Sequence, residues 1–419
     1  MNKKSNFGKF LLLWTGELIS SIGGGLTSFG LGVYIFNQTG SAANMAIVTL
    51  LGFLPTLVLS VPAGVLADRY DRRLLMMIGD GCSALGIVYI LVCMATGGAQ
   101  FWQICLGVSV SAIFSALLEP SFRATITELL TKEEYSKASG LVSLAGSARY
   151  LFSPVIAGFL LTVSDVKLLL FIDMCTFFLT VISAAVVRHG IGSTVVEKKE
   201  SFAESFKGGW AAITAKPGIF MIIVVSAGIT LFMGVFQILA EPLILSFADS
   251  KTLGISETIC ACGMLASSIV LGIKGIKNHF VKALGISLMS AGAFMFGFGS
   301  FKNIIVICSF GFMFFAALPV ANNCLDYLTR TNIPEETQGR AWGLIGFISQ
   351  MGYVVAYAVS GFAADAIGKA TGLGVGRGSA VTVQIAGICL AATSALILVI
   401  KSIRELETGT ERSPEFVAK

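Results

Sequence analysis

The stretch Gly64-Val-Leu-Ala-Asp68-Arg69-Tyr-Asp-Arg72-Arg73 is the most informative part of the chain. It is a short, charge-dense segment, and an apolar run long enough to cross a bilayer lies on each side of it. Charged side chains are costly inside a bilayer, so such a segment lies at the membrane surface or serves a function. The stretch therefore predicts two membrane helices joined by a functional loop.

The composition independently indicates a membrane protein. Of the 419 residues, 55% are hydrophobic and 13% are charged, and the mean hydropathy of +0.84 is far above that of soluble domains. A helix needs about 20 apolar residues to cross the hydrocarbon core of a bilayer. By this measure the sequence predicts twelve membrane spans, at residues 10–36, 44–66, 74–96, 100–122, 138–162, 167–188, 217–247, 253–274, 280–300, 303–329, 338–364 and 378–402.

The basic residues predict how the chain is oriented. With the N-terminus inside, 23 of the 29 Lys and Arg residues fall on the cytoplasmic side, 5 fall on the opposite side and Arg149 lies within a helix. Because cytoplasmic loops collect Lys and Arg, we expect a multi-pass protein of the plasma (inner) membrane with both termini in the cytoplasm. The net charge of +5 is then a topology signal, and no nucleic-acid partner is expected.

Sequence patterns typical of other function classes are not found. The nine cysteines fall within predicted helices without a C-x-x-C pair, and the two histidines have no ligand residues near them in sequence, so no metal site is expected. The lack of a G-x-x-x-x-G-K-[ST] motif argues against an ATP-driven pump. No nucleophile–base pattern occurs either, so we expect neither an enzyme nor a bound cofactor.

An internal repeat indicates the domain organisation. Gly140 and Gly158 in the fifth predicted span have the same separation as Gly343 and Gly361 in the eleventh. We therefore expect two diverged copies, an N-terminal half over 1–188 and a C-terminal half over 217–402, with a cytoplasmic linker over 189–216 and a polar tail over 403–419. Aromatic and apolar residues that recur every three or four positions in the linker predict a surface helix. A docking site for a regulatory protein is the alternative there.

The charged stretch resembles the G-x-L-a-D-r-x-g-r-k signature that follows the second membrane helix in the major facilitator superfamily of secondary transporters, with Asp71 in place of a glycine. The resemblance implies an all-α membrane protein with twelve transmembrane helices in two pseudo-symmetric six-helix halves. It also implies that substrate binds between the halves and moves by alternating access. The loop is expected to act as a conformational latch made by Gly64, Asp68, Arg69, Arg72 and Arg73.

In this latch, we expect Asp68 to meet the positively polarised N-terminus of the eleventh helix near Gly339 and Arg340. The three arginines are expected to pair with Glu119, with Asp71 or with anionic lipid headgroups. The alternative is that the arginines only enforce topology. Asp68 favours the latch, because an acidic residue adds nothing to a positive-inside signal.

Within the superfamily, the chain is similar to the macrolide-efflux branch of bacterial drug:proton antiporters. Ser153-Pro154-Val-Ile-Ala157-Gly158 is similar to the G-P-x-x-G-G antiporter motif, with Ser and Ala in place of two glycines. Because proline removes a backbone donor and glycine permits close helix approach, a kink or a tight helix contact is expected at Pro154 and Gly158. The other stretches that carry the resemblance are Glu17–Gly23, Glu119–Arg123, Ala138–Leu141 and Phe171–Asp173.

Energy coupling is expected from ionisable groups inside the membrane, where a charge is costly unless it is paired or functional. Arg149 is predicted to lie deepest and to have either an acidic neighbour or an anionic group of the substrate as its partner, with Glu17 as the first choice. Two interpretations are open: Glu17 binds and releases a proton, or it forms a permanent bridge to Arg149 that fixes helix packing. Asp173 and Glu119 are expected to serve packing. The proton-coupling candidates are Glu17, Arg149, Asp80 and Glu241.

Together these inferences predict a monomeric secondary transporter in membrane lipids that exports amphipathic or hydrophobic small molecules, driven by the proton gradient and not by a cofactor. A lipid or lysolipid transporter of the same fold is one alternative, and a non-transporting membrane sensor or scaffold is another. Side chains from the central helices are expected to line the substrate pocket, namely Phe29, Tyr34, Phe53, Phe232, Met233, Phe236, Gln237, Tyr353 and Tyr357.

Overall fold

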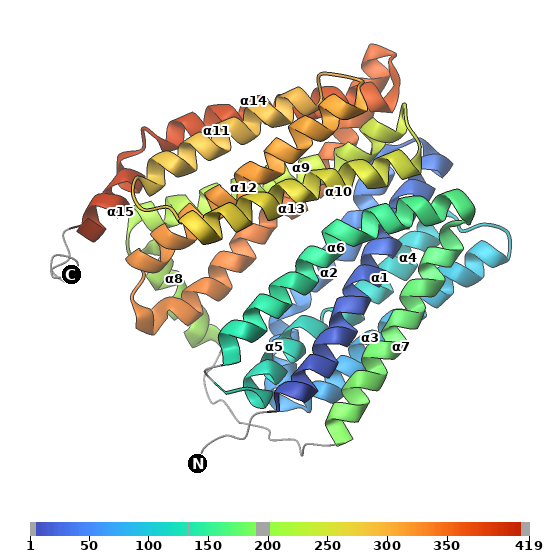
Figure 1. Ribbon diagram of the computed structural model, residues 1–419, viewed down its shortest axis with the longest axis horizontal. Helices are drawn as coiled ribbons and strands as arrows, with labels where there is room; N and C mark the ends of the chain where they lie inside the picture. The colour runs from blue at the N-terminus through green and yellow to red at the C-terminus, as the bar shows by residue number, and fades with distance from the viewer. Residues whose placement is uncertain (1–5, 132–133, 190–201, 412–419) are drawn as a thin grey trace. The chain divides into compact units, whose positions relative to one another are not determined.

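The computed structural model describes residues 6–131, 134–189 and 202–411, and these residues form fifteen α-helices and no strand (Figure 1). The predicted all-α class is therefore confirmed. Residues 190–201 of the predicted linker and 412–419 of the predicted tail lie outside the described part. The helices are α1 (Phe7–Thr39), α2 (Ala42–Arg69), α3 (Arg72–Ala95), α4 (Phe101–Ser115), α5 (Leu118–Leu129), α6 (Tyr135–Val163), α7 (Val166–His189), α8 (Phe202–Thr214), α9 (Pro217–Leu245), α10 (Ser250–Lys274), α11 (Phe280–Phe298), α12 (Ile304–Asn332), α13 (Glu335–Thr371), α14 (Gly374–Ile397) and α15 (Lys401–Glu411).

Within the described ranges, twelve segments are long and apolar enough to cross a membrane, as the sequence predicts. The fourth of them is not the single helix expected at 100–122, because it combines α4 and α5. The break falls at Ala116 and Leu117, just before Pro120. Proline has no N–H to bond the carbonyl four residues earlier. The carbonyl of Ala116 therefore loses its helical donor, and the chain begins a new helix.

Local sequence sets the ends of the helices. The residue after α1 is Gly40, whose φ of 60° lies in the left-handed region that glycine adopts without a steric penalty. Ser41 then caps α2, since its Oγ accepts a hydrogen bond from the backbone N–H of Asn44 at 3.2 Å. Asn303 caps α12 in the same way, accepting from the N–H of Ile305 at 3.0 Å. Turn residues thus separate the apolar runs.

The chain forms two compact units. The N-terminal unit comprises residues 1–198 and 248–258, and the C-terminal unit comprises residues 199–247 and 259–419. This division differs from the predicted halves, because the first turns of α10 belong to the N-terminal unit. Those turns pack on α6, where a Cβ added to Gly254 would meet the carbonyl of Pro154. Glycine therefore allows the two backbones to approach closely.

In the N-terminal unit, α1 lies between α6 and α7 (Figure 1). Small residues make this packing close: Gly16 faces Ser183 of α7, and Gly30 faces Leu169 on the same helix. On the other side, Ser153 of α6 donates a hydrogen bond to the carbonyl of Ile22 at 2.9 Å. The residues of α1 that face α7 are therefore close to the polar groups of that helix.

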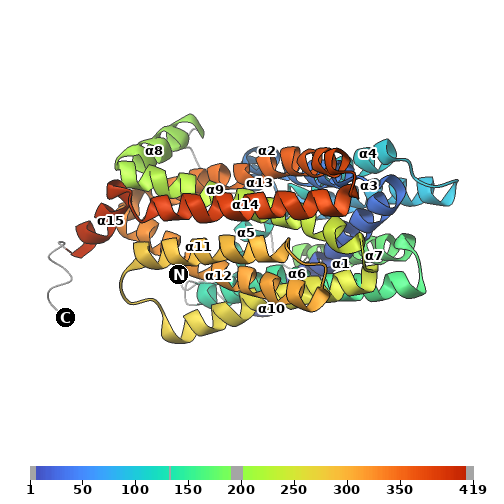
Figure 2. The same ribbon diagram turned by 90° about the horizontal axis from the view of Figure 1, so that it is seen from above.

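In the C-terminal unit, α11 packs against α12 and α14 (Figure 2). An aromatic cluster in the core of this unit joins α9, α11 and α12. The ring of Phe236 on α9 stacks on Phe314 of α12, with centroids 4.6 Å apart, and lies 4.5 Å from the ring of Phe298 on α11. Large rings packed in this way make a major contribution to the apolar area that is buried.

Two short helices lie outside the predicted spans. The first, α8, occupies the stretch where the sequence predicts a surface helix. The second, α15, was not predicted, because residues 403–419 were expected to form only a polar tail. Ile403 and Leu406 of α15 are buried at 0% and 4% exposure, and Gly218 of α9 faces Leu406. Two apolar residues in a polar stretch are too weak a pattern to predict such a helix.

Candidate functional site

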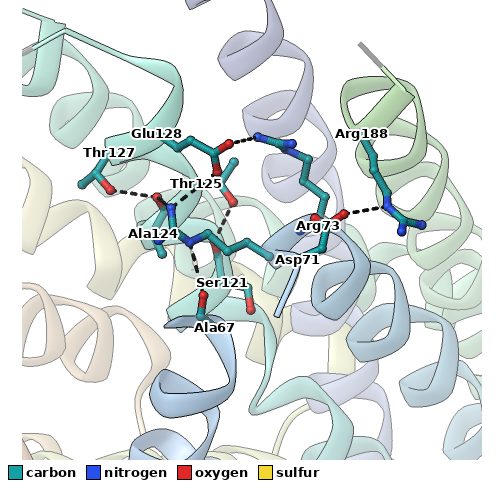
Figure 3. Close-up of polar contacts among 10 residues, drawn as sticks. Ala67, Asp71, Arg73, Ser121, Ala124, Thr125, Thr127, Glu128 and Arg188 are labelled. Carbon is teal, nitrogen blue, oxygen red and sulfur yellow. Dashed lines mark hydrogen bonds and ion pairs between the residues drawn. The ribbon is translucent and has the colours of Figure 1, made fainter. Parts of the chain in front are cut away.

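The turn between α2 and α3 is organised by Asp71. It is the N-cap of α3: its Oδ1 accepts a hydrogen bond from the N–H of Arg73 at 3.0 Å, and its Oδ2 accepts one from Nε of Arg188 at 2.7 Å (Figure 3). Partial burial acts to raise the pKa of Asp71, but the bonds from Arg188 and from the amides of Arg73 and Leu74 hold this pKa below its usual value of 3.8. The ion-pair partner of Asp71 is therefore Arg188 of α7, and not an arginine of its own turn.

The two arginines after Asp71 bind one carboxylate on α5. Nη2 of Arg73 lies 2.6 Å from Oε1 of Glu128 (Figure 3). Nη1 of Arg72 lies 3.4 Å from Oε2 of the same carboxylate. Nε of Arg72 also donates to the carbonyl of Ala67 at 3.2 Å, in the last turn of α2, where carbonyls lack helical donors. The Arg73 side chain is only 1% exposed. Glu128 thus holds the ends of α2, α3 and α5 together.

The predicted pairing of these arginines with Glu119 is wrong. Glu119 instead pairs with Arg123 on its own helix at 2.8 Å, and both side chains are exposed. It precedes Glu128 on α5 by nine residues, about 13 Å along the helix axis. Glu128 was not predicted from the sequence, although an acidic residue in the last turn of a helix opposes the helix dipole and so indicates a partner elsewhere.

The remaining residues of the signature lie in the last turns of α2. Asp68 and Arg69 are exposed, and Gly64 is half-buried. No hydrogen bond or ion pair joins Asp68 to another described residue of the N-terminal unit. Its predicted partner, the eleventh span, belongs to the other unit, and the side chains of residues 339 and 340 lie outside the described part. The latch therefore stays a prediction.

Three carboxylates lie within the N-terminal unit, on α1, α3 and α7. Asp80 of α3 and Asp173 of α7 are buried at 2% and 1% exposure, and Glu17 of α1 is half-buried. Asp80 is close enough to both of the others for their charges to interact. The structure thus places Asp80 within electrostatic range of Glu17, another predicted coupling residue, and of Asp173, which was expected to serve packing. Glu241, another predicted coupling residue, is half-buried on α9 in the C-terminal unit.

The two buried aspartates differ in their hydrogen bonds. The carboxylate of Asp173 accepts from Oγ1 of Thr27 at 2.5 Å, whereas Oγ1 of Thr176, 3.4 Å from Oδ1, donates at 2.7 Å to the backbone carbonyl of Asp173. Asp80 lies beside Thr180 of α7, yet its Oδ1 is buried and has no hydrogen-bond partner among the described residues. A buried carboxylate oxygen without a donor is costly when the group is charged. Asp80 is therefore the member of this cluster best suited to take up a proton.

Arg149 does not pair with Glu17, contrary to the prediction. Its Nη2 donates to Oγ of Ser28 at 3.0 Å, its side chain is exposed, and the carboxylate whose charge it acts on is Asp173. Ser28 follows Glu17 by eleven residues on α1, about 16 Å along the axis. Arg149 and Glu17 therefore lie at different levels of the helix, and the permanent bridge is not formed in this structure.

The sequence matches the family model described as Major Facilitator Superfamily over residues 13–357. The chain belongs to the major facilitator superfamily. It is 27% identical to macrolide efflux protein A of Streptococcus pyogenes, covering 88% of this chain and 92% of the relative. It is 24% identical to the multidrug efflux pump Tap of Mycolicibacterium fortuitum, covering 86% and 90%.

The structural comparison agrees with this assignment. The solved structure of a bacterial homologue of the iron transporter ferroportin has a TM-score of 0.72 at 14% identity, and the match covers 94% of this chain and 100% of that one. This likeness concerns the fold. Family and fold together make the chain a multi-pass membrane protein of a transporter family, whose members take small-molecule substrates.

The residues that resemble the antiporter motif of the superfamily lie on α6. A Cβ on Gly158 would lie 2.7 Å from the carbonyl of Ser250, and a Cβ on Gly254 would meet the carbonyl of Pro154. Pro154 lies inside α6, where it removes one backbone donor. The close helix contact expected at this motif is found between α6 and the beginning of α10, within the N-terminal unit.

The predicted pocket residues of the N-terminal unit lie in different environments. Phe29 is packed in the core at 4% exposure. Tyr34 is half-buried, and its hydroxyl donates to the carbonyl of Ala99 at 3.3 Å. Phe53 of α2 is half-buried. Phe29 therefore serves the core of its unit in this structure.

In the C-terminal unit, Met233 and Phe236 are core residues at 8% and 3% exposure, and Phe232 is half-buried. The other three predicted pocket residues form a polar group between α9 and α13. The hydroxyl of Tyr357 donates to Oε1 of Gln237 at 2.8 Å, and the ring of Tyr353 lies 5.7 Å from that of Tyr357. Of the predicted pocket residues in this unit, these three offer polar atoms.

A further carboxylate, Glu257, was missed by the sequence analysis. It is half-buried on α10, one helical turn after Gly254. Like Glu17, Glu257 is an acidic residue within an apolar run, and this feature could have identified it from the sequence. Among the described residues, no group of three or more His, Cys, Asp or Glu side chains is placed to hold a metal ion.

Proposed function

We propose that this transporter exports amphipathic or hydrophobic small molecules, such as macrolides, in exchange for protons. The direction and the substrate class rest on the likeness to a macrolide efflux protein and to a multidrug efflux pump. The observation that supports proton coupling is the carboxylate cluster of Glu17, Asp80 and Asp173 in the N-terminal unit. Asp80 is the proposed proton carrier, because one of its buried oxygens has no donor among the described residues.

Coupling requires that proton and substrate differ in affinity between two conformations. A protonated Asp80 suits a dry and apolar surrounding, whereas its anion needs water or a cation. A conformational change that admits water to the cluster from one side at a time would therefore release the proton to that side. Asp173 already receives the hydroxyl donor of Thr27 and would keep its place in the packing of α1 on α7.

We expect both termini to face the cytoplasm, as the distribution of 23 basic residues against 5 implies. The charged cluster of Asp71, Arg72, Arg73 and Glu128 would then lie at the cytoplasmic ends of α2, α3 and α5. A green fluorescent protein fused at residue 419 should fluoresce and an alkaline phosphatase fused there should be inactive. The reverse result would contradict this orientation.

The proposal is tested with purified protein in proteoliposomes that have an acidic lumen, where proton exit can drive substrate entry. Erythromycin, ethidium and lysophosphatidylcholine are offered separately. We expect gradient-dependent accumulation of erythromycin or ethidium. Asp80→Asn should abolish accumulation but retain downhill exchange, because only the proton step is lost. Asp165→Asn is the matched control, since Asp165 is an exposed aspartate in the loop before α7.

Each result decides between the alternatives. Accumulation of lysophosphatidylcholine alone would identify a lipid transporter. Failure of folded protein to move any of the three probes would contradict transport of these classes and favour a sensor or scaffold. Gradient-driven accumulation that survives Asp80→Asn would refute the role of Asp80 while leaving drug export intact.

A further inference from the structure

The turn between α10 and α11 corresponds by the internal repeat to the turn between α2 and α3, but it has lost its acidic residues. Asp71 caps α3 in the first turn, whereas the second turn, Gly275-Ile-Lys-Asn-His279, contains no Asp or Glu. Glu128 stands two residues before the C-cap of α5, and two residues before the C-cap of α12 stands Thr331. The C-terminal unit therefore lacks both carboxylates at the corresponding positions.

The N-terminus of α11 needs an acceptor from elsewhere. Its N-cap residue is His279, which has a φ of 61° and makes no side-chain cap hydrogen bond. The first amides of a helix have no acceptor within the helix. The first helical bond of α11 is made by the N–H of Ala283, so the amides of Phe280 and Val281 depend on an outside group.

Glu407 of α15 is that group. Its Oε1 accepts a hydrogen bond from the N–H of Phe280 at 2.8 Å, and its Oε2 accepts one from the N–H of Val281 at 3.3 Å. A carboxylate bonded to backbone amides at a helix N-terminus is favoured by hydrogen bonding and by the helix dipole together. A residue from the C-terminal helix thus does for α11 what Asp71 does for α3.

Further contacts hold α15 at this end of the C-terminal unit (Figure 2). The carbonyl of Leu406 accepts from Nδ2 of Asn332 at 3.2 Å, and Oδ1 of the same asparagine accepts from Nζ of Lys216 at 3.1 Å. A Cβ added to Gly218 would meet the carbonyl of Ser402. The short helix therefore contacts the beginning of α9, the beginning of α11 and the end of α12.

We propose that α15 is a clamp within the C-terminal unit, in which Glu407 replaces the acidic residues missing from the second turn and makes the beginnings of α9 and α11 and the end of α12 move as one body. Alternating access by rigid-body motion needs such rigidity in each half. The effect on transport rests on the proposed function. The existence of the clamp does not depend on the proposed function, because the rigidity of the unit can be measured without a substrate.

The first test is amide hydrogen exchange on the purified full-length protein. Glu407→Ala should speed exchange of the amides of Phe280 and Val281 by about tenfold or more, as expected for the loss of a charge-assisted hydrogen bond. Exchange at the beginning of α9 and the end of α12 should rise with it. Glu405→Ala is the matched control, because Glu405 lies on the same helix with its side chain 61% exposed and should leave exchange unchanged.

The second test restores the cap from within the turn. His279→Asp puts an acidic residue at the N-cap position that Asp71 occupies before α3. The double variant His279→Asp with Glu407→Ala should recover protection of the α11 amides. In proteoliposomes with erythromycin, Glu407→Ala should lower the maximal rate without changing the concentration for half-maximal rate, and the double variant should regain the rate.

Unchanged exchange at the start of α11 in Glu407→Ala would overturn the proposal. So would faster exchange confined to that one helix, because α9 and α12 would then not be clamped, and so would an erythromycin transport rate that stays normal when the cap is lost. A wild-type protein that fails to move erythromycin would instead contradict the proposed function. In that case the amide exchange rates of α9, α11 and α12 in Glu407→Ala still decide for or against the clamp.

Discussion

Replacing Glu128 by glutamine tests whether one carboxylate holds the charged turn together. This side chain binds Arg73 at 2.6 Å and Arg72 at 3.4 Å. The Arg73 side chain is 1% exposed and Glu128 is 15% exposed, so solvent cannot replace the lost negative charge. Glutamine keeps the size and one acceptor oxygen of glutamate, and the substitution therefore removes the charge with little change in packing.

The expected loss follows from the burial of the pair. Removing one partner of a buried ion pair costs about 3–5 kcal/mol, because the other charge stays buried. Since the amide oxygen introduced by Glu128→Gln would still accept a hydrogen bond, we take the lower end, about 3 kcal/mol. For a unit of about 200 residues, 1 kcal/mol corresponds to about 2–4 °C, which gives a fall in melting temperature of about 6–12 °C.

The measurement is tryptophan-fluorescence thermal unfolding of the detergent-solubilised protein. Glu119→Gln is the matched control, because Glu119 lies on the same helix and pairs with Arg123, but both side chains are exposed and such pairs contribute about 0–1 kcal/mol. Equal melting temperatures for Glu128→Gln and Glu119→Gln would refute the buried-pair argument. Combining Glu128→Leu with Arg73→Met should recover part of the lost stability, since the most deeply buried guanidinium is then removed and Arg72 keeps its bonds to the carbonyls of Ala67 and Ala124.

Three further predictions concern other charged groups. The pKa of Asp71 is lower in the folded than in the unfolded chain. Its ion pair therefore stabilises the folded state at pH values above the usual pKa of 3.8, and this stabilisation is lost as the pH falls through the folded-state pKa. Asp71→Asn should therefore lower the melting temperature at neutral pH and have a vanishing effect in acid, and an effect that does not change with pH would contradict this. Asp68→Asn should strongly lower transport in proteoliposomes while its melting temperature stays normal, because Asp68 is exposed; full transport would disprove the latch. Glu17→Gln should unfold at the wild-type temperature, since Arg149 bonds Ser28 instead; a large destabilisation that Arg149→Met reverses would restore the bridge interpretation.

The membrane spans were predictable because their length and apolar character are properties of local sequence. The break in the fourth span was equally local, since Pro120 removes the donor that Ala116 needs, but the expected span simply included the proline. The helix α15 could not be predicted in this way, because its two buried apolar residues are buried only by packing on the surface of α9. Length and hydropathy thus predict which segments span the membrane, and packing decides what happens at their ends.

The ion pairs were not predictable from spacing, because they join helices far apart in sequence. Arg73 and Glu128 are separated by 55 positions and Asp71 and Arg188 by 117. Whether two such side chains meet depends on how each helix is rotated about its axis. The expected pair of Glu17 and Arg149 failed because of height along the helices: both are rare charges in apolar runs, but Arg149 of α6 reaches α1 at Ser28, about 16 Å along the axis from Glu17.

The carboxylate cluster shows how neighbouring acidic residues can be given different roles by their hydrogen bonds. Asp173 receives a hydroxyl donor from Thr27, which lowers the cost of burying its charge. Asp80 is equally buried, but one of its oxygens has no donor among the described residues. A proton that enters the cluster is therefore stabilised more on Asp80 than on Asp173, so that Asp80→Asn should remove proton coupling, whereas Asp173→Asn should first disturb the packing of α1 on α7.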